Sequence, residues 1–232
     1  FHALGWLAGI AAAGITNDLK LIFLISAASF VIGFLFTIKL PNPIQEKELT
    51  PGTTKTVILK NKFLFLSLLL RHIGAAAVWT ILPIMIVEKL GGELYHISIV
   101  YVANTMAAFI LMNVMASKIH LSNITKFKIG VGCTTFVFIG LSVITEWWMA
   151  MPFMALVGAT WAFLFIGGNF HLMENNPRST STGIFSSTLS IATVIGPIIA
   201  GSIAFLFDYV AVMYFAVAII IVAFVVSLKI KK

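Results

Sequence analysis

Cysteine is almost absent from this chain, which carries one, Cys133, among its 232 residues. A disulfide framework needs cysteines in pairs, and a thiolate metal site needs several at short spacing. Both are excluded for this sequence, and we expect no metal and no cofactor. Cys133 lies inside an apolar stretch, so we predict that it is a small residue of the core.

Charged residues are also scarce. They make up 10% of the chain, whereas hydrophobic residues make up 60% and the mean hydropathy is +1.06. Ordinary soluble domains contain about 25% charged residues, so this composition excludes them. The net charge of +7 is spread over short segments between apolar stretches, and it therefore requires no nucleic-acid partner.

Recognisable catalytic patterns are lacking as well. The sequence has no Gly-x-Ser-x-Gly elbow, no His-Glu-x-x-His motif and no pair of carboxylates within one apolar stretch. These patterns mark hydrolases and metalloproteases. An integral-membrane enzyme is consequently the least favoured of the functions considered below, and we expect no enzymatic activity.

What the sequence does contain is a series of apolar segments of helical length. Alternation of apolar and polar residues, which is typical of a membrane β-barrel, is absent from them, and in lipid only helices or closed barrels satisfy every backbone group. We therefore predict an all-α, polytopic transmembrane helix bundle with about eight spans. These are expected over residues 1–16, 21–39, 63–87, 95–116, 127–145, 147–171, 184–206 and 209–228.

The basic residues sort to one side of the predicted membrane. Lys20 and Lys89 fall on one side and Arg71 lies inside a span, whereas the remaining twelve of the fifteen lie on the other side. Lysine and arginine concentrate in cytoplasmic loops, so we expect this second side, and both ends of the chain, to be cytoplasmic. The twelve are Lys39, Lys47, Lys55, Lys60, Lys62, Lys118, Lys126, Lys128, Arg178, Lys229, Lys231 and Lys232.

One intervening segment differs from the others in being rich in proline and charge. Residues 41–61 contain Pro41, Pro43 and Pro51 and no long apolar run, a composition typical of a linker; a short interfacial segment is expected over 56–62. We predict a cytoplasmic inter-domain linker at 41–61, preceded by two helices at 1–40 and followed by a six-helix bundle at 62–232. The first apolar segment is shorter than the ~20 residues of a full crossing, so we interpret 1–40 as the last two helices of a truncated N-terminal bundle.

Two passages resemble the C-terminal half of major facilitator superfamily transporters. Leu82-Pro83 through Glu88-Lys89-Leu90-Gly91 is similar to the outer end of that family's seventh helix and the following turn. Asn176-Pro177-Arg178-Ser179-Thr180, with Gly183, Gly196-Pro197 and Gly201, is similar to the loop between helices ten and eleven and to helix eleven. The resemblance implies that the chain comprises helices five to twelve of twelve. It also implies a plasma-membrane protein, monomeric in the bilayer.

Arg71 is the first candidate site residue. It lies about eight residues into its span, or ~12 Å below the membrane edge. A charge at that depth marks a functional site by default, and the alternative is an arginine that snorkels to the headgroups; the sequence leaves both open. Arg71 is expected to face inward. The proposed substrate-binding set is Arg71, Trp79, Asn104 and Trp161.

Other residues are assigned to movement and coupling. His72 is the one titratable group near mid-membrane apart from Arg71, because none of the eight acidic residues lies at mid-membrane. His171 and Glu174 have the i, i+3 spacing of a metal pair, but without further ligands we favour gating contacts of Glu174 with Arg178. Asn113 is expected to bridge helices. The gating or coupling set is His72, Glu174 and Arg178, and the packing and hinge set is Gly183, Gly196, Pro197 and Gly201.

These features predict a secondary active transporter that moves a small solute by alternating access between two helical bundles. Its partners would be the solute, a coupling proton or ion and the lipid bilayer. One alternative is a non-transporting membrane receptor or scaffold that retains the transporter fold. The sequence does not select the solute, since aromatic span interiors suit hydrophobic compounds and Arg71 suits anionic metabolites.

Overall fold

The computed structural model describes residues 2–16, 19–38 and 53–230, and every regular element in these ranges is helical. Seven helices within the described residues are long and apolar enough to cross a membrane, and a shorter apolar helix covers Gly5–Gly14. The prediction of an all-α, polytopic helix bundle is confirmed. The elements are α1 (His2–Thr16), α2 (Leu19–Ile38), α3 (Thr53–Lys60), α4 (Lys62–Glu88), α5 (Leu94–Ser117), α6 (Asn123–Ser142), η1 (Trp147–Met149), α7 (Ala150–Asn175), α8 (Arg178–Leu206) and α9 (Tyr209–Leu228).

Two helices begin earlier than the sequence predicts, because polar first turns hide them from a hydropathy reading. α6 begins at Asn123, where the Ser122 side chain accepts a hydrogen bond from the Thr125 backbone amide as an N-cap. α8 begins at Arg178, directly after Pro177. Of the predicted linker, residues 41–52 lie outside the described residues, while 53–60 form α3 in agreement with the expected short segment.

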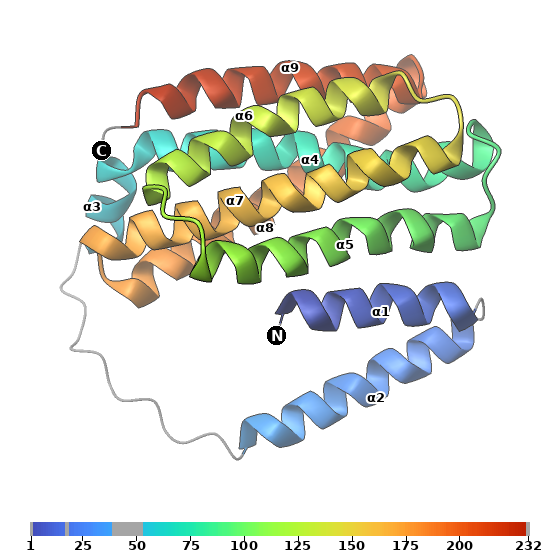
Figure 1. Cartoon of the computed structure of the whole chain (residues 1–232), viewed down its shortest axis with the longest axis horizontal. Coiled ribbons are helices and arrows are strands. Elements are labelled where there is room, and N and C mark those ends of the chain that lie inside the picture. Colours follow the sequence, from blue (N-terminus) through green and yellow to red (C-terminus); the bar gives the residue numbers. More distant parts are fainter. Residues whose placement is uncertain (1, 17–18, 39–52, 231–232) are drawn as a thin grey trace.

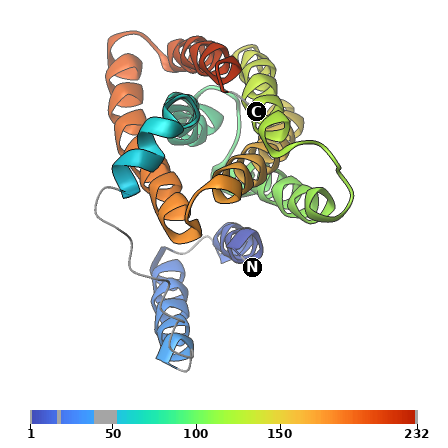
Figure 2. The ribbon, with the colours of Figure 1, turned by 90° about the vertical axis from the view of Figure 1, so that its left-hand side faces the viewer.

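α4 is the central helix of the bundle that follows α3. It packs between α8 and α9; α9 also packs on α6, α6 on α7, and α7 on α5. Seen end-on, α4 lies inside the ring formed by these neighbours (Figure 2). α1 packs along α5, whereas α2 makes its few contacts with α1 and stands away from the bundle (Figure 1). No part of the apolar window of α2 is buried against the described chain.

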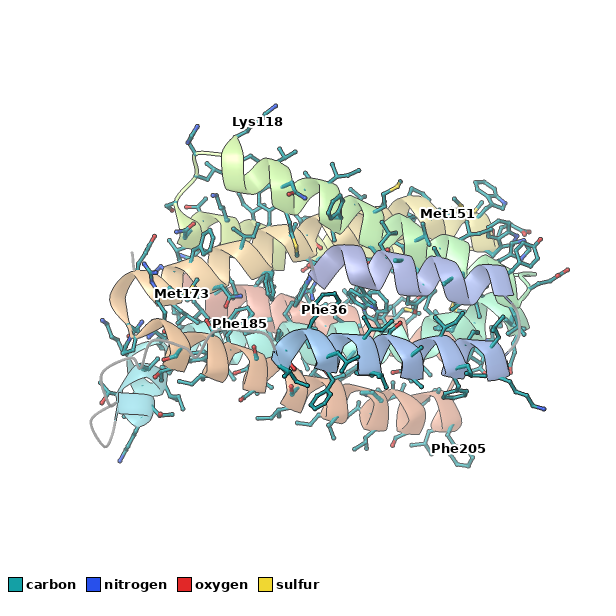
Figure 3. All side chains as sticks on the ribbon, turned by 90° about the horizontal axis from the view of Figure 1, so that it is seen from below. Phe36, Lys118, Met151, Met173, Phe185 and Phe205 are labelled. Carbon is teal, nitrogen blue, oxygen red and sulfur yellow. The ribbon has the colours of Figure 1, made fainter. Side chains whose placement is uncertain are left out.

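The two ends of the bundle differ in charge. The basic end, on the left in Figure 1, carries α3, the α7–α8 turn and the end of α9, together with Lys118 at the end of α5 (Figure 3). At the opposite end, near Phe205 in Figure 3, short turns join the helices. There Lys89 pairs with Asp208 at 3.8 Å, and the Tyr209 hydroxyl donates to Glu88 at 2.5 Å. The basic residues of the described chain thus separate toward one end, as the sequence predicts.

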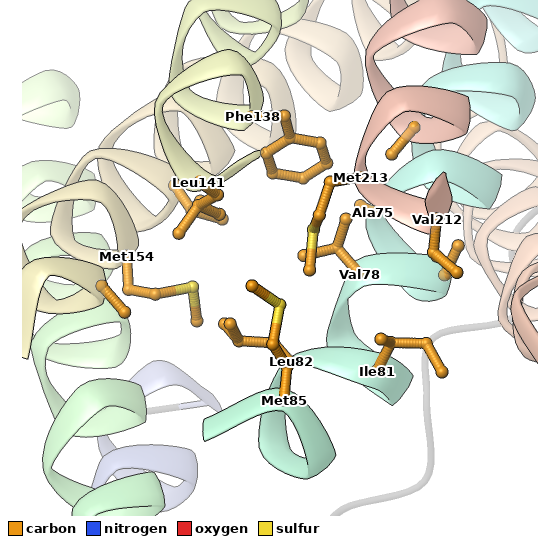
Figure 4. Close-up of a cluster of buried hydrophobic side chains, with 14 of the residues drawn as sticks. Ala75, Val78, Ile81, Leu82, Met85, Phe138, Leu141, Met154, Val212 and Met213 are labelled. Carbon is orange, nitrogen blue, oxygen red and sulfur yellow. The ribbon is translucent and has the colours of Figure 1, made fainter. Parts of the chain in front are cut away.

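Two large clusters along the bundle axis make up most of the apolar core of the described residues, beside a small third cluster around Ala162 and Ile166 of α7. The larger one lies toward the opposite end, where Leu82 and Met85 of α4 meet Phe138 of α6, Met154 of α7 and Met213 of α9 (Figure 4). The smaller one lies toward the basic end and includes Leu64, Leu68, Phe127, Leu164 and Phe185. Between them lie the buried polar side chains of Arg71, Thr134 and Thr160, which we call the polar layer.

Candidate functional site

Arg71 projects from the middle of α4 into the polar layer, where 1% of its surface is exposed. Its Nη2 donates to Thr134 Oγ1 of α6 at 3.3 Å, and Thr134 in turn donates to the Gly130 carbonyl at 2.6 Å. The predicted inward orientation of Arg71 is confirmed. The snorkelling alternative does not fit this geometry, because a side chain held against α6 inside the bundle does not reach the headgroups.

Trp161 of α7 lies against both residues of the Arg71–His72 pair. The Arg71 guanidinium carbon is 5.6 Å from its ring centroid, and the His72 ring is 5.5 Å away and tilted. An aromatic face attracts a cation in this position. The ring centroid of Phe165 lies 5.3 Å from that of Trp161 and 5.7 Å from that of Phe185 of α8. The Trp161 ring thus faces the cation, and Phe165 and Phe185 extend the aromatic contacts from Trp161 to α8.

The polar groups of this pair are incompletely satisfied. Arg71 Nε and His72 Nδ1 are buried and have no hydrogen-bond partner among the described residues. No described acidic residue forms an ion pair with Arg71. A buried charge is normally paired, because removing it from water is costly. An anion that approached Arg71 would therefore gain a charge-assisted hydrogen bond.

Trp79 belongs to a second aromatic group, eight residues along α4 and thus ~12 Å from Arg71 along the helix axis. It stacks on Trp6 of α1 at 5.4 Å and meets Tyr101 of α5 edge-on at 4.5 Å. The Tyr101 hydroxyl donates to the Trp79 carbonyl at 2.9 Å. The structure thus places Trp79 where α4, α5 and α1 meet, in a different group of contacts from Arg71 and Trp161.

Asn104 and Asn113, both on α5, have different surroundings. Asn104 is buried, and its Nδ2 donates to the Met154 carbonyl at 3.1 Å, so that it joins α5 to α7. Gly158 allows this approach, because a Cβ there would collide with the Asn104 carbonyl. Asn113 is exposed and donates to the Phe109 carbonyl of its own helix at 2.7 Å. Asn104 thus bridges two helices, while its substrate contact and the bridging contact expected of Asn113 stay predictions.

Glu174 and Arg178, two of the three residues of the gating or coupling set, lie at the basic end. Glu174 accepts a hydrogen bond from Asn123 Nδ2 at 2.6 Å and lies 3.9 Å from His171 Nδ1. Glu174 and Arg178 line one groove of about 420 Å³ without forming an ion pair between them. The described residues contain no group of three or more potential metal ligands. Glu174 is thus positioned by α6, and its contact with Arg178 stays a prediction.

The four packing and hinge residues have different surroundings on α8. At Gly196 a Cβ would meet Ala76 Cβ at 2.6 Å and the Ile73 carbonyl at 2.7 Å, so close packing on α4 requires glycine there. Pro197 follows it inside the helix. At Gly183 and Gly201 a Cβ would meet nothing within 4 Å. Within the described chain, close packing is consequently seen at Gly196 alone among these glycines.

Cys133 is exposed on α6, and the prediction that it lies in the core is wrong. α6 buries the face that carries Phe127, Val131 and Thr134, and Cys133 is rotated away from that face. Hydropathy could not reveal this, because apolar residues occur on every side of α6. The sequence reading also missed Thr134, whose one weak signal is a hydroxyl at the centre of an apolar helix.

Two comparisons with known proteins give this chain no family. No family model matches the chain, and no curated protein matches its sequence.

Proposed function

We propose that the protein is a secondary active transporter of the major facilitator type, which carries a small organic anion across the membrane by alternating access. The observation that carries this proposal is Arg71: a cation inside the bundle, backed by Trp161, with its Nε unpaired and no described acid beside it. An intramembrane charge of this kind is by default a functional site.

The surroundings of Arg71 suit an anion that also carries an apolar or aromatic part. Trp161 and Phe165 offer ring faces beside the guanidinium. His72 adds an unpaired nitrogen next to Arg71, and an imidazole nitrogen can accept a proton. We assign solute attraction to Arg71, the aromatic wall to Trp161, and proton coupling to His72.

Alternating access requires two bodies that move against each other. In this proposal α4 to α9 form one body, and α1 and α2 belong to the other. Their contact runs along α5 and includes the Trp6–Trp79 stack. Rocking of the two bodies would open and close the space beside α4, and the linker would accommodate the motion. The basic end would face the cytoplasm of a cell whose plasma membrane holds the protein.

Solute binding and counterflow test the proposal on the intact protein. We expect benzoate, and small carboxylates generally, to raise its melting temperature more than benzyl alcohol or other neutral analogues, because bound ligand stabilises the folded state. Proteoliposomes loaded with unlabelled benzoate should accumulate labelled benzoate. Arg71→Ala should abolish both effects, whereas Asn113→Ala, on the exposed face of α5, should retain them.

The same assay separates the alternatives. Anion binding that depends on Arg71 without counterflow would favour the receptor or scaffold function. Equal stabilisation by anions and neutral analogues, unchanged by Arg71→Ala, would contradict the role of Arg71. Asn104→Ala would decide whether that residue contacts solute: loss of counterflow with retained binding would fit its bridging contact between α5 and α7 instead.

The orientation can be tested with the chain's lone thiol removed. In a Cys133→Ser background, Lys229→Cys should react with a membrane-impermeant maleimide only after the cells are permeabilised. Asp208→Cys, at the opposite end, should react in intact cells. The reverse pattern would exclude a cytoplasmic basic end.

A further inference from the structure

Thr134 contacts Arg71 from α6 and belongs to none of the residue sets predicted from the sequence. A threonine hydroxyl has one hydrogen to donate, and buried Thr134 donates it to the Gly130 carbonyl of the preceding turn at 2.6 Å. Only the lone pairs of its oxygen are left for other groups. Because an arginine side chain carries donors and no acceptor, Thr134 is suited to hold Arg71 and has no hydrogen to offer an anion.

Gly130 fixes where this hydroxyl lies relative to α7. A Cβ at Gly130 would meet backbone atoms of α7 at 2.5 Å and 2.7 Å, the second of them the Thr160 carbonyl, so the two helix backbones approach closely at this point. Trp161 follows Thr160, and the Arg71 guanidinium lies over its ring. The turn that anchors Thr134 therefore also sets the spacing between its hydroxyl and the Trp161 ring.

The Arg71 side chain is thus held at two points by two different helices. Trp161 of α7 contacts the guanidinium carbon and Thr134 of α6 binds Nη2, while the Nε hydrogen stays unpaired. A free arginine side chain has many rotamers, and ordering it when a ligand binds costs affinity. A guanidinium that is already held leaves less order for the ligand to impose.

We infer that Thr134 is a positioning residue of the anion site, which keeps the Arg71 guanidinium in the orientation that receives the solute. Thr134 acts through Arg71 and does not touch the anion itself. This inference rests on the proposed function, because it requires an anion at Arg71. It adds that the affinity for this anion depends on a hydroxyl of α6, a helix that carries none of the predicted site residues.

Benzoate binding by the intact protein, measured from the rise of the melting temperature with benzoate concentration, tests this role. Thr134→Val keeps the shape of the side chain and removes the hydroxyl. It should weaken benzoate binding about tenfold, because the guanidinium is no longer ordered before the anion arrives. Thr134→Ser should bind benzoate within about twofold of the wild-type protein, because a serine hydroxyl has the same donor and acceptors.

Benzoate counterflow separates positioning from a defect of the fold. In Thr134→Val the benzoate concentration that gives half-maximal counterflow should rise about tenfold, while the maximal rate should stay within about twofold. Thr105→Val is the matched control, because Thr105 is buried on α5 and donates to the Tyr101 carbonyl of its own helix at 3.2 Å without bonding to Arg71. Both benzoate binding and counterflow should stay at the wild-type level in this control.

Wild-type affinity in Thr134→Val, or an equal loss of affinity in Thr134→Ser, would overturn the positioning role. A lower maximal rate with an unchanged half-maximal concentration would also overturn it, since that pattern marks a structural defect. Arg71→Ala keeps these results apart from a failure of the proposed function. If Arg71→Ala abolishes binding and Thr134→Val leaves it unchanged, the positioning role alone is lost, whereas unchanged binding in both variants would overturn both proposals.

Discussion

α4 and α8 pack against each other, are similar in length and each contain one internal proline, yet they occupy opposite kinds of environment. In α4, 61% of the apolar window is buried, whereas in α8 the figure is 17%. α4 holds its charged residue inside the bundle. α8 presents a row of small and hydroxylated residues on its exposed side, including Thr182, Ser186, Ser190 and Thr193. The sequence composition of a span is therefore not a guide to which of its polar groups are enclosed.

The difference teaches what each helix contributes. The polar group of α4 is positioned by α6 and α7, so its geometry belongs to the folded bundle. The polar groups of α8 lie on a surface that the described chain leaves open, and they are available to lipid, solute or another helix. Substitutions at matched positions on the two helices can test this contrast.

The largest effect on stability is expected at the contact between the two helices. Gly196→Leu places a side chain against Ala76 and the Ile73 backbone, and overpacking of this kind costs about 1–3 kcal/mol or prevents folding. Gly201→Leu, on the open side of α8, should cost less than ~0.5 kcal/mol. Thermal unfolding of the two variants measures the difference. Equal stability would mean that α8 does not pack on α4 at Gly196.

The largest effect on activity with little effect on folding is expected at Arg71. Arg71→Met replaces an uncompensated buried cation with an apolar side chain of similar length. Replacing buried charges by hydrophobic residues is often neutral or stabilising, so the melting temperature should be kept or raised. Anion counterflow should fall about tenfold or more, since the attraction for the anion is lost. A strongly destabilised variant would show instead that Arg71 serves the fold.

A smaller effect is expected at matched serines. Ser67 of α4 is buried and donates to the Ala223 carbonyl of α9 at 2.8 Å, whereas Ser190 of α8 is exposed. Ser67→Val removes a bridge between helices and should destabilise the bundle by about 1 kcal/mol. Ser190→Val should change stability by less than ~0.5 kcal/mol. If both serines proved equally important, the exposed face of α8 would be covered in the intact protein.

The smallest effect is expected where the ends of the two helices are linked. Lys89 follows α4 and pairs with Asp208 after α8, but both side chains are more than 40% exposed. Exposed ion pairs contribute about 0–1 kcal/mol, so Lys89→Ala should alter the unfolding temperature only slightly. A large fall in the unfolding temperature at low salt that disappears at high salt would instead show a strong electrostatic link between the helix ends.

The sequence predicts the spans well because long apolar runs have few alternatives in a membrane protein. It also places Arg71 inward, since a charge facing lipid is costly. It fails where rotation about a helix axis decides the outcome. Apolar residues occur on every side of α6, so nothing local shows that Cys133 faces out. The bridging contact of Asn104 depends on Gly158 of a helix far along the chain.

The split of the hydrophobic core into two large clusters has a consequence for motion within the bundle. Because Arg71, Thr134 and Thr160 interrupt the apolar packing, a polar layer separates the two large clusters, and in it Arg71 donates a hydrogen bond to Thr134 of α6. One cluster can loosen while the other keeps its packing. The backbone amides of the bundle should therefore exchange in two cooperative groups, one for each cluster. Removing the charge of Arg71 would then change the packing of both clusters at once.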